Sequence, residues 1–168
     1  MARFVVWSWL RFSQYSWRYL PTAQDSPHVH APGANPDRLL IVGDGASAGV
    51  GVTTHDLGLG GYLARNLSRI TGRATDIDIV IRRDMTARSY IDAVREVDLS
   101  QFDLILVSLG MHEVLRFEER EAWSRAMSAL LDQMAETASA ATVTVVLSMP
   151  YHYPACTAFH GRGRAAPP

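Results

Sequence analysis

The sequence contains no lysine, because all 16 of its basic residues are arginine. P-loop nucleotide binding, Schiff-base chemistry and a tyrosine–lysine proton relay each depend on a lysine amine. The absence of lysine therefore excludes these three mechanisms. The chain has 17 acidic residues and a formal net charge of −1 at pH 7. This balance gives no electrostatic argument for binding a nucleic acid, and we expect no nucleic-acid partner.

Cysteine is nearly absent as well, since Cys156 is the only one. One thiol cannot form an intramolecular disulfide, and no cysteine cluster is present to hold zinc. A free thiol is typical of a reducing compartment, so we expect a cytoplasmic protein. His28-Val29-His30 is an isolated His-x-His pattern without further ligands, and it predicts a solvated loop and no metal site. No cofactor is expected.

Long hydrophobic runs are also missing. The run at residues 4–10 is too short to span a bilayer, and two tryptophans make it a poor secretory signal. Aromatic residues alternate with arginines up to residue 20, so membrane contact through an interfacial helix is one interpretation. Packing on the domain or on a partner is the preferred one. Residues 21–37 contain four prolines and predict a linker or surface loop.

The pattern becomes regular after Arg38. Short apolar runs alternate with segments whose apolar residues recur at helical spacing, and this predicts an α/β domain with a parallel sheet. In such a fold the functional residues lie at the carboxyl ends of the strands. Residues 1–37 are therefore an aromatic segment and linker, residues 38–154 the domain, and residues 155–168 a low-complexity tail. The expected strands are residues 39–42, 77–81, 102–109 and 143–147.

The glycine-rich residues 43–51 follow the first expected strand and support several interpretations. Gly45, Gly49 and Gly51 resemble the dinucleotide loop of short-chain dehydrogenases, but that family also requires a catalytic lysine. Gly45-Ala46-Ser47-Ala48-Gly49 matches the nucleophile elbow G-x-S-x-G. However, α/β-hydrolases place several strands before that elbow.

A third interpretation explains more of the chain. Gly43-Asp44-Gly45 to Gly49, then Asp84-Met85-Thr86, then Gly110-Met111-His112-Glu113 each follow a successive expected strand. In this order they resemble three sequence blocks of the SGNH/GDSL hydrolases, a family of esterases and lipases. The resemblance implies a three-layer α/β/α fold with a flavodoxin-like sheet. It also implies hydrolysis of carboxylic esters through a serine acyl-enzyme, with a small-molecule ester or polar ligand as partner.

The chain departs from the family pattern at several positions. Gly45 stands where the family has its nucleophilic serine, Asp84 where it has a glycine, and His112 where it has an asparagine. No Asp-x-x-His block follows the last strand. The only such motif, Asp25-Ser26-Pro27-His28, precedes the domain and is interpreted as a coincidence.

These departures leave two functions open from the resemblance, besides the less favoured dinucleotide-binding module. In the first, Ser47 replaces the missing nucleophile and His112 or His152 acts as its base, which requires residues 45–47 to be extended. In the second, Ser47 satisfies backbone groups and the protein is a non-catalytic member of the fold. The rim would then bind a small polar ligand through Asp44, Gly45, Asp84 and Gly110.

Overall fold

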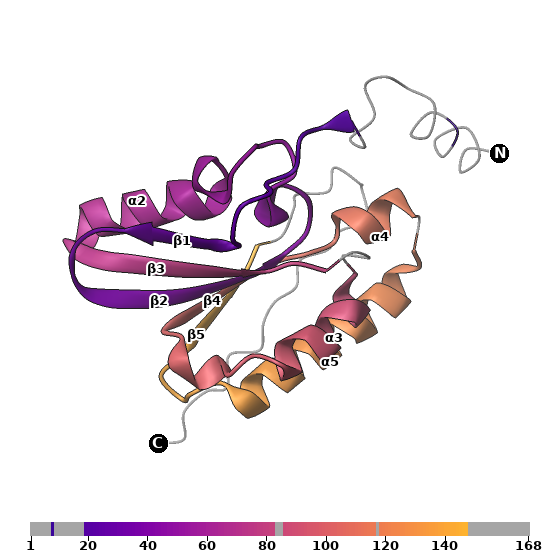
Figure 1. Ribbon diagram of the computed structural model, residues 1–168. Coiled ribbons are helices and arrows are strands. Elements are labelled where there is room, and N and C mark those ends of the chain that lie inside the picture. Colours follow the sequence, from indigo (N-terminus) through magenta and orange to yellow (C-terminus); the bar gives the residue numbers. More distant parts are fainter. Residues whose placement is uncertain (1–7, 9–18, 83–85, 117, 148–168) are drawn as a thin grey trace, which may run out of the picture.

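The computed structural model describes residues 8, 19–82, 86–116 and 118–147, which form an α/β domain around a five-stranded sheet (Figure 1). The strand order is β1-β3-β2-β4-β5. β1 is antiparallel to β3, and all other neighbouring pairs are parallel. The α/β class is confirmed, with a mixed sheet in place of the fully parallel one expected. The strands are β1 (His28–Ala31), β2 (Ala34–Gly43), β3 (Arg73–Val80), β4 (Leu104–Ser108) and β5 (Val143–Val146).

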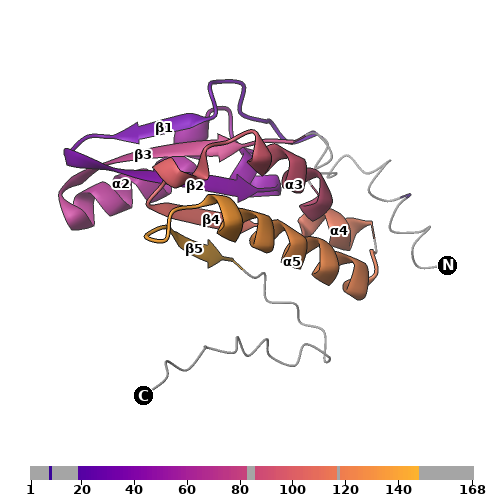
Figure 2. The ribbon, with the colours of Figure 1, turned by 90° about the horizontal axis from the view of Figure 1, so that it is seen from below.

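Helices cover both faces of the sheet (Figures 1 and 2). The helix α2 packs on β1 and β3, while α3 and α5 lie side by side against the opposite face. Among the described residues, no helix is long and apolar enough to cross a membrane. The helices are α2 (Leu59–Thr71), α3 (Ala87–Arg95), α4 (Met111–Leu115) and α5 (Arg120–Thr137), and short 3₁₀ helices are η2 (Gly45–Ala48), η3 (His55–Leu57) and η4 (Leu99–Gln101).

The position of β2 at the centre of the sheet explains why its sequence contains an unbroken apolar run. Leu39 and Ile41 belong to the core under α2, whereas Leu40 and Val42 belong to the core under α3 and α5. Successive side chains on a strand point to opposite faces, so a strand covered on both sides must be apolar at every position. The apolar pattern therefore locates this strand at the middle of the fold.

Local signals for helix ends agree with the structure. Gly72 follows α2 in the left-handed conformation, with φ +70°. Thr86 is the N-cap of α3, and its hydroxyl accepts the backbone N–H of Ser89. Both residue types suit their positions, since glycine favours the left-handed C-terminal position and threonine favours the N-cap.

The predicted linker at residues 21–37 is wrong for its second half. His28–Ala31 forms β1, and β2 begins at Ala34, ahead of the domain start expected at Arg38. In β1 the residues Val29 and Ala31 are buried and the two histidines are exposed. Pro32 and Gly33 form the turn between the two strands, while Pro27 precedes β1 and Pro36 lies within β2. These prolines masked the strand alternation in the sequence.

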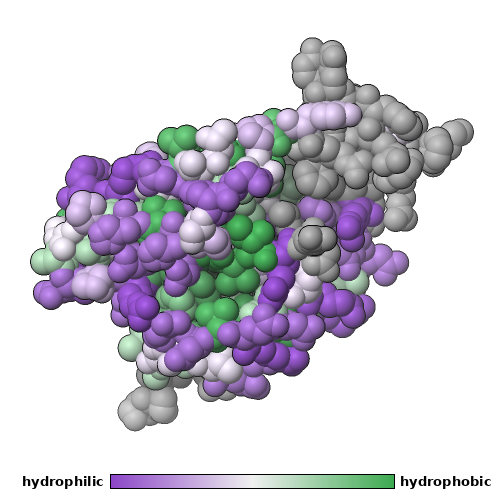
Figure 3. All heavy atoms as spheres, viewed as in Figure 1, coloured by the Kyte–Doolittle hydropathy of each residue, from purple (hydrophilic) through white to green (hydrophobic). Residues whose placement is uncertain are grey.

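The other edge of the sheet is apolar and open. Every residue of β5 is exposed, and Val143 keeps 56% of its surface accessible. Figure 3 shows a hydrophobic patch surrounded by hydrophilic residues on the face that Figure 1 presents. The described part of the sheet thus ends in an uncovered strand. Most of the aromatic segment at residues 1–20, Asp84, His152 and the tail at 155–168 lie outside the described residues.

Candidate functional site at the carboxyl rim

The strand order reverses between β2 and β4. From β2 the chain crosses to β3 on one side and then to β4 on the other. Gly43 and Ser108 are partners at the carboxyl ends of these two strands, and the Asp44 N–H donates to the Ser108 carbonyl over 2.9 Å. Loops that leave neighbouring strands in opposite directions open a crevice at such a reversal. A ligand-binding or catalytic site in this fold is therefore expected at this rim.

Asp44 occupies the reversal point itself. Its side chain is buried, and its Oδ2 atom accepts the backbone N–H of His112 over 3.0 Å. Burial raises the pKa of Asp44 above its ordinary value, although the backbone N–H groups of His112 and Gly110 act in the opposite direction. Asp44 thus connects the loop after β2 to the start of α4, two segments that the sequence predicted to lie close together. One oxygen of its carboxylate is bound to the His112 backbone N–H.

Gly45 and Ser47 lie in a 3₁₀ turn and not in an extended segment. A 3₁₀ helix turns by about 120° per residue, so positions 45 and 47 point in directions about 240° apart. Ser47 is 5% exposed and packs against Gly43. The extended geometry on which a catalytic Ser47 depends is absent.

Gly45 itself has a conformation that favours glycine. Its φ is +53°, in the left-handed region. A Cβ built at this position would meet only Met111 Cε, at 3.5 Å. The position therefore has room for a side chain, and backbone conformation is what opposes one.

The third cluster lies beside the first, as predicted. Gly110 precedes α4 with φ +128°, and His112 is partly buried in the first turn of that helix. Glu113 is 4% exposed, and its Oε1 atom accepts the N–H of Ala87 at the start of α3 over 2.7 Å. The cluster at 110–113 thus contacts both the loop after β2 and the start of α3. The first and third clusters are therefore in contact, and Thr86 of the second cluster lines a cavity with Glu113, whereas Asp84 and Met85 lie outside the described residues.

Glu113 stands out electrostatically. Burial raises its pKa, and the negative charges of Asp44 and Glu118 add to the increase, while the Ala87 N–H acts against it. Its Oε2 atom is buried and has no hydrogen-bond partner. Sequence analysis noted the residue without giving it a role, since its partner on α3 is 26 positions away.

A cavity of about 210 Å³ lies next to Glu113. It is formed where α3, α4 and α5 meet, close to Gly110, because the Trp123 ring lies 3.7 Å from a Cβ built on that glycine. Trp123 Nε1 is a second buried polar atom without a hydrogen-bond partner. The residues that line the cavity are Thr86, Arg88, Glu113, Arg116, Glu118, Trp123 and Ala126.

Sequence analysis missed a second polar pair, Asp25 and His55. The Asp25 carboxylate accepts the His55 backbone N–H over 3.0 Å and lies 2.8 Å from the ring Nδ1. Desolvation acts to raise the pKa of Asp25, but the hydrogen bonds from His55 outweigh it and lower that pKa. This pairing joins segments 30 residues apart, and no local pattern marks it. Asp25 therefore does engage a histidine, but not the His28 of its Asp-x-x-His motif.

The Asp25–His55 pair resembles the carboxylate–imidazole half of a catalytic triad. In such a triad the distal nitrogen faces the nucleophile. Here His55 is 2% exposed, and its Nε2 atom is buried without a partner against Gly49, where a Cβ would lie 3.3 Å from it. The imidazole is closed off by backbone, so its role is to hold the N-terminal segment on the glycine loop.

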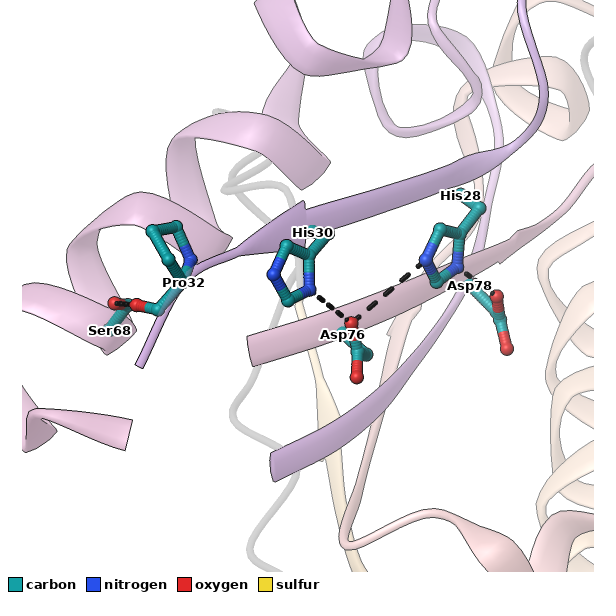
Figure 4. Close-up of polar contacts among 6 residues, drawn as sticks. All are labelled: His28, His30, Pro32, Ser68, Asp76 and Asp78. Atoms are coloured by element: carbon teal, nitrogen blue, oxygen red, sulfur yellow. Dashed lines mark hydrogen bonds and ion pairs between the residues drawn. The ribbon is translucent and has the colours of Figure 1, made fainter. Parts of the chain in front are cut away.

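His28 and His30 lie on the exposed face of β1 and not in a loop. Each Nδ1 atom is 2.7 Å from an aspartate on β3, His28 from Asp78 and His30 from Asp76 (Figure 4). These are cross-strand pairs that support the edge of the sheet. Within the described part of the chain, no group of three or more histidine, cysteine or acidic side chains could hold a metal ion.

Comparisons of the chain with family models, curated proteins and solved structures found no match. The resemblance to SGNH hydrolases consequently has no support from these comparisons. What the fold and the rim define is an α/β protein with buried carboxylates and a small cavity at the carboxyl ends of its strands.

Proposed function

We propose that the chain has the three-layer, flavodoxin-like fold of the SGNH/GDSL type. Two features support this proposal. The parallel strands lie in the order β3-β2-β4-β5 across the sheet. If these four strands are numbered by their order in the chain, this arrangement is 2-1-3-4, as at the start of the flavodoxin-like order. Helices also lie on both faces of the sheet. The three clusters that carry the resemblance also converge at one rim, as far as they are described. Each cluster follows the strand that the family order requires.

The function that we propose is binding of a small polar ligand at this rim, without serine hydrolysis. The main observation behind this proposal is that no accessible serine hydroxyl occupies the position of the nucleophile. Gly45 has no side chain, and the nearest serine, Ser47, is buried in a 3₁₀ turn and is 5% exposed. Nucleophilic catalysis needs a hydroxyl within hydrogen-bond reach of a base and accessible to the acyl group.

A labelling experiment tests the absence of serine chemistry. The wild-type protein is incubated with a fluorophosphonate probe and assayed with p-nitrophenyl acetate, beside the variants Ser47→Ala and Gly45→Ser and an active serine esterase. We expect labelling and turnover from the esterase alone. Gly45→Ser should also stay inactive, because φ is +53° at this position, which strains a serine, and because no Asp-x-x-His block follows the last strand to supply the base. Labelling of wild type that disappears in Ser47→Ala would overturn the proposal and establish Ser47 as a nucleophile.

A dinucleotide-binding module is a weaker alternative. In the structure, η3 separates the glycine loop from α2, so the N-terminus of α2 does not directly follow that loop. Pyrophosphate binding relies on that direct connection. We expect NADH and NADPH to leave the melting temperature unchanged, whereas a ligand that binds the native state would raise it.

A further inference from the structure

Two residues that line the cavity between α3, α4 and α5 each carry a buried polar atom without a hydrogen-bond partner, and the two atoms are of opposite character. Glu113 Oε2 is an acceptor, and Trp123 Nε1 carries a hydrogen and can only donate. Buried polar groups in proteins are almost always hydrogen-bonded, and an unpartnered buried carboxylate oxygen is costly. Two such atoms on residues that line one cavity indicate that a group outside the described residues completes them.

The surrounding charges also come in both signs. The residues that line the cavity include Arg88 and Arg116, which are basic, and Glu113 and Glu118, which are acidic. Arg88 lies in the first turn of α3, on the exposed surface. A ligand of one sign would meet repulsion from half of these groups. A molecule with one positive and one negative group can orient so that each group faces lining residues of the opposite charge.

We propose that this cavity binds a small zwitterion of the α-amino-acid type. The ligand ammonium donates to Glu113 Oε2, and the ligand carboxylate accepts the Trp123 N–H and pairs with Arg88. This assignment deepens the proposed function by naming the ligand class, and it rests on that function. Charge-assisted hydrogen bonds of this kind are stronger than neutral ones. Both orphan atoms have almost no accessible surface, so their side chains must turn toward the cavity as the ligand enters.

The size of the cavity limits the ligand. Pockets for drug-sized molecules hold about 300–1,000 Å³, and this cavity has about 210 Å³. A small amino acid fits such a volume, and a nucleotide or a long acyl chain does not. The aliphatic part of the ligand would lie against the Trp123 ring and Ala126, which supply the apolar share of the lining.

Titration calorimetry on the full chain tests the proposal. Glycine and L-alanine are the probes, and acetate, methylamine and propionamide are their matched controls, each lacking one charge or both. We expect the two amino acids to bind and the three controls to bind at least tenfold more weakly. Equal binding of acetate or methylamine would overturn the zwitterion class, and no binding of either amino acid would overturn the site.

Three variants locate the binding. Glu113→Gln removes the acceptor charge, Trp123→Phe keeps an aromatic ring without the N–H, and Arg88→Met keeps the aliphatic stem without the guanidinium. We expect each to weaken glycine binding at least fivefold, and Glu136→Gln, on the exposed side of α5, to leave it unchanged. Arg88 is exposed, so its substitution is safe for folding even if the two buried changes are not. Unchanged binding in Arg88→Met and in any folded buried variant would overturn the assignment.

The two proposals fail in different ways. Labelling of Ser47 by the fluorophosphonate would remove the non-catalytic function while leaving the calorimetric result to be judged on its own. Absence of both labelling and amino-acid binding would remove the zwitterion site and leave the non-catalytic fold in place.

Discussion

At the scale of single residues, Tyr90 illustrates how one buried side chain fixes the rim. It belongs to α3, is fully buried, and its hydroxyl donates to the carbonyl of Gly43 at the end of β2. We expect Tyr90→Phe to lower the free energy of unfolding by about 1–3 kcal/mol, because the Gly43 carbonyl is left buried without this partner. Urea unfolding measures the change, and Tyr62→Phe on the exposed face of α2 is the control. Equal stability of both variants would contradict the prediction.

Residue roles were predictable from the sequence where the signal is local. Thr86 and Gly72 are recognisable because capping and left-handed backbone depend on residue type and immediate neighbours. Asp44 and Gly110 were placed at the rim because each follows a strand. The partner of Asp25 was not predictable, since contacts across 30 residues depend on the tertiary fold. The role of Ser47 was not predictable either, because it depends on the backbone conformation of residues 45–47. The sequence does not determine that conformation, since glycine allows several.

At the scale of elements, residues 21–25 form a strap across the glycine loop. The Ala23 N–H donates to the Gly49 carbonyl, the Gly51 N–H donates to the Pro21 carbonyl, and Asp25 holds His55. We expect Asp25→Asn to speed amide hydrogen exchange of Ala23 and Gly51 several-fold, because the neutral amide loses its charge-assisted bond to the imidazole. The same exchange rates in Asp25→Asn and wild type would show that backbone bonds alone hold the strap.

A matched control keeps the strap experiment specific. Asp56→Asn alters a neighbouring exposed carboxylate that pairs with Arg65 on the surface, and surface pairs contribute little. It should leave the exchange of Ala23 and Gly51 unchanged. An equal effect of both variants would show a general response to lost negative charge.

Elements were predictable to the extent that their periodicity is strong. The alternation of apolar runs and helical stripes gave the order β2, α2, β3, α3, β4, α5 and β5, since buried strands and amphipathic helices have distinct spacing. β1 was missed because four residues among prolines carry too short a pattern.

At the scale of the whole molecule, two packed layers of side chains follow from a sheet that is covered on both faces. The core under α2 and the core under α3 and α5 share the strands β2 and β4. The sequence predicted this arrangement through the fully apolar strands. It did not predict that Asp44 and Glu113 would both be buried at the same rim, where their charges interact.

The buried acids Asp44 and Glu113 give the molecule a pH dependence of definite sign. Their ordinary pKa values are 3.8 and 4.5, and both are raised in the folded state. The folded protein therefore binds protons more tightly than the unfolded chain, so this contribution to stability is complete below pH 4 and is lost as the pH rises through the raised values. Asp25 and Asp98 have lowered pKa values, so their contribution is present above 3.8 and is lost below it. We expect the contribution of Asp44 and Glu113 to the free energy of unfolding, measured by urea titration, to fall as the pH rises above their ordinary pKa values of 3.8 and 4.5. Glu113→Gln should flatten this slope and the exposed Glu136→Gln should not; stability that rises with pH in wild type, or an unchanged slope in Glu113→Gln, would refute the assignment.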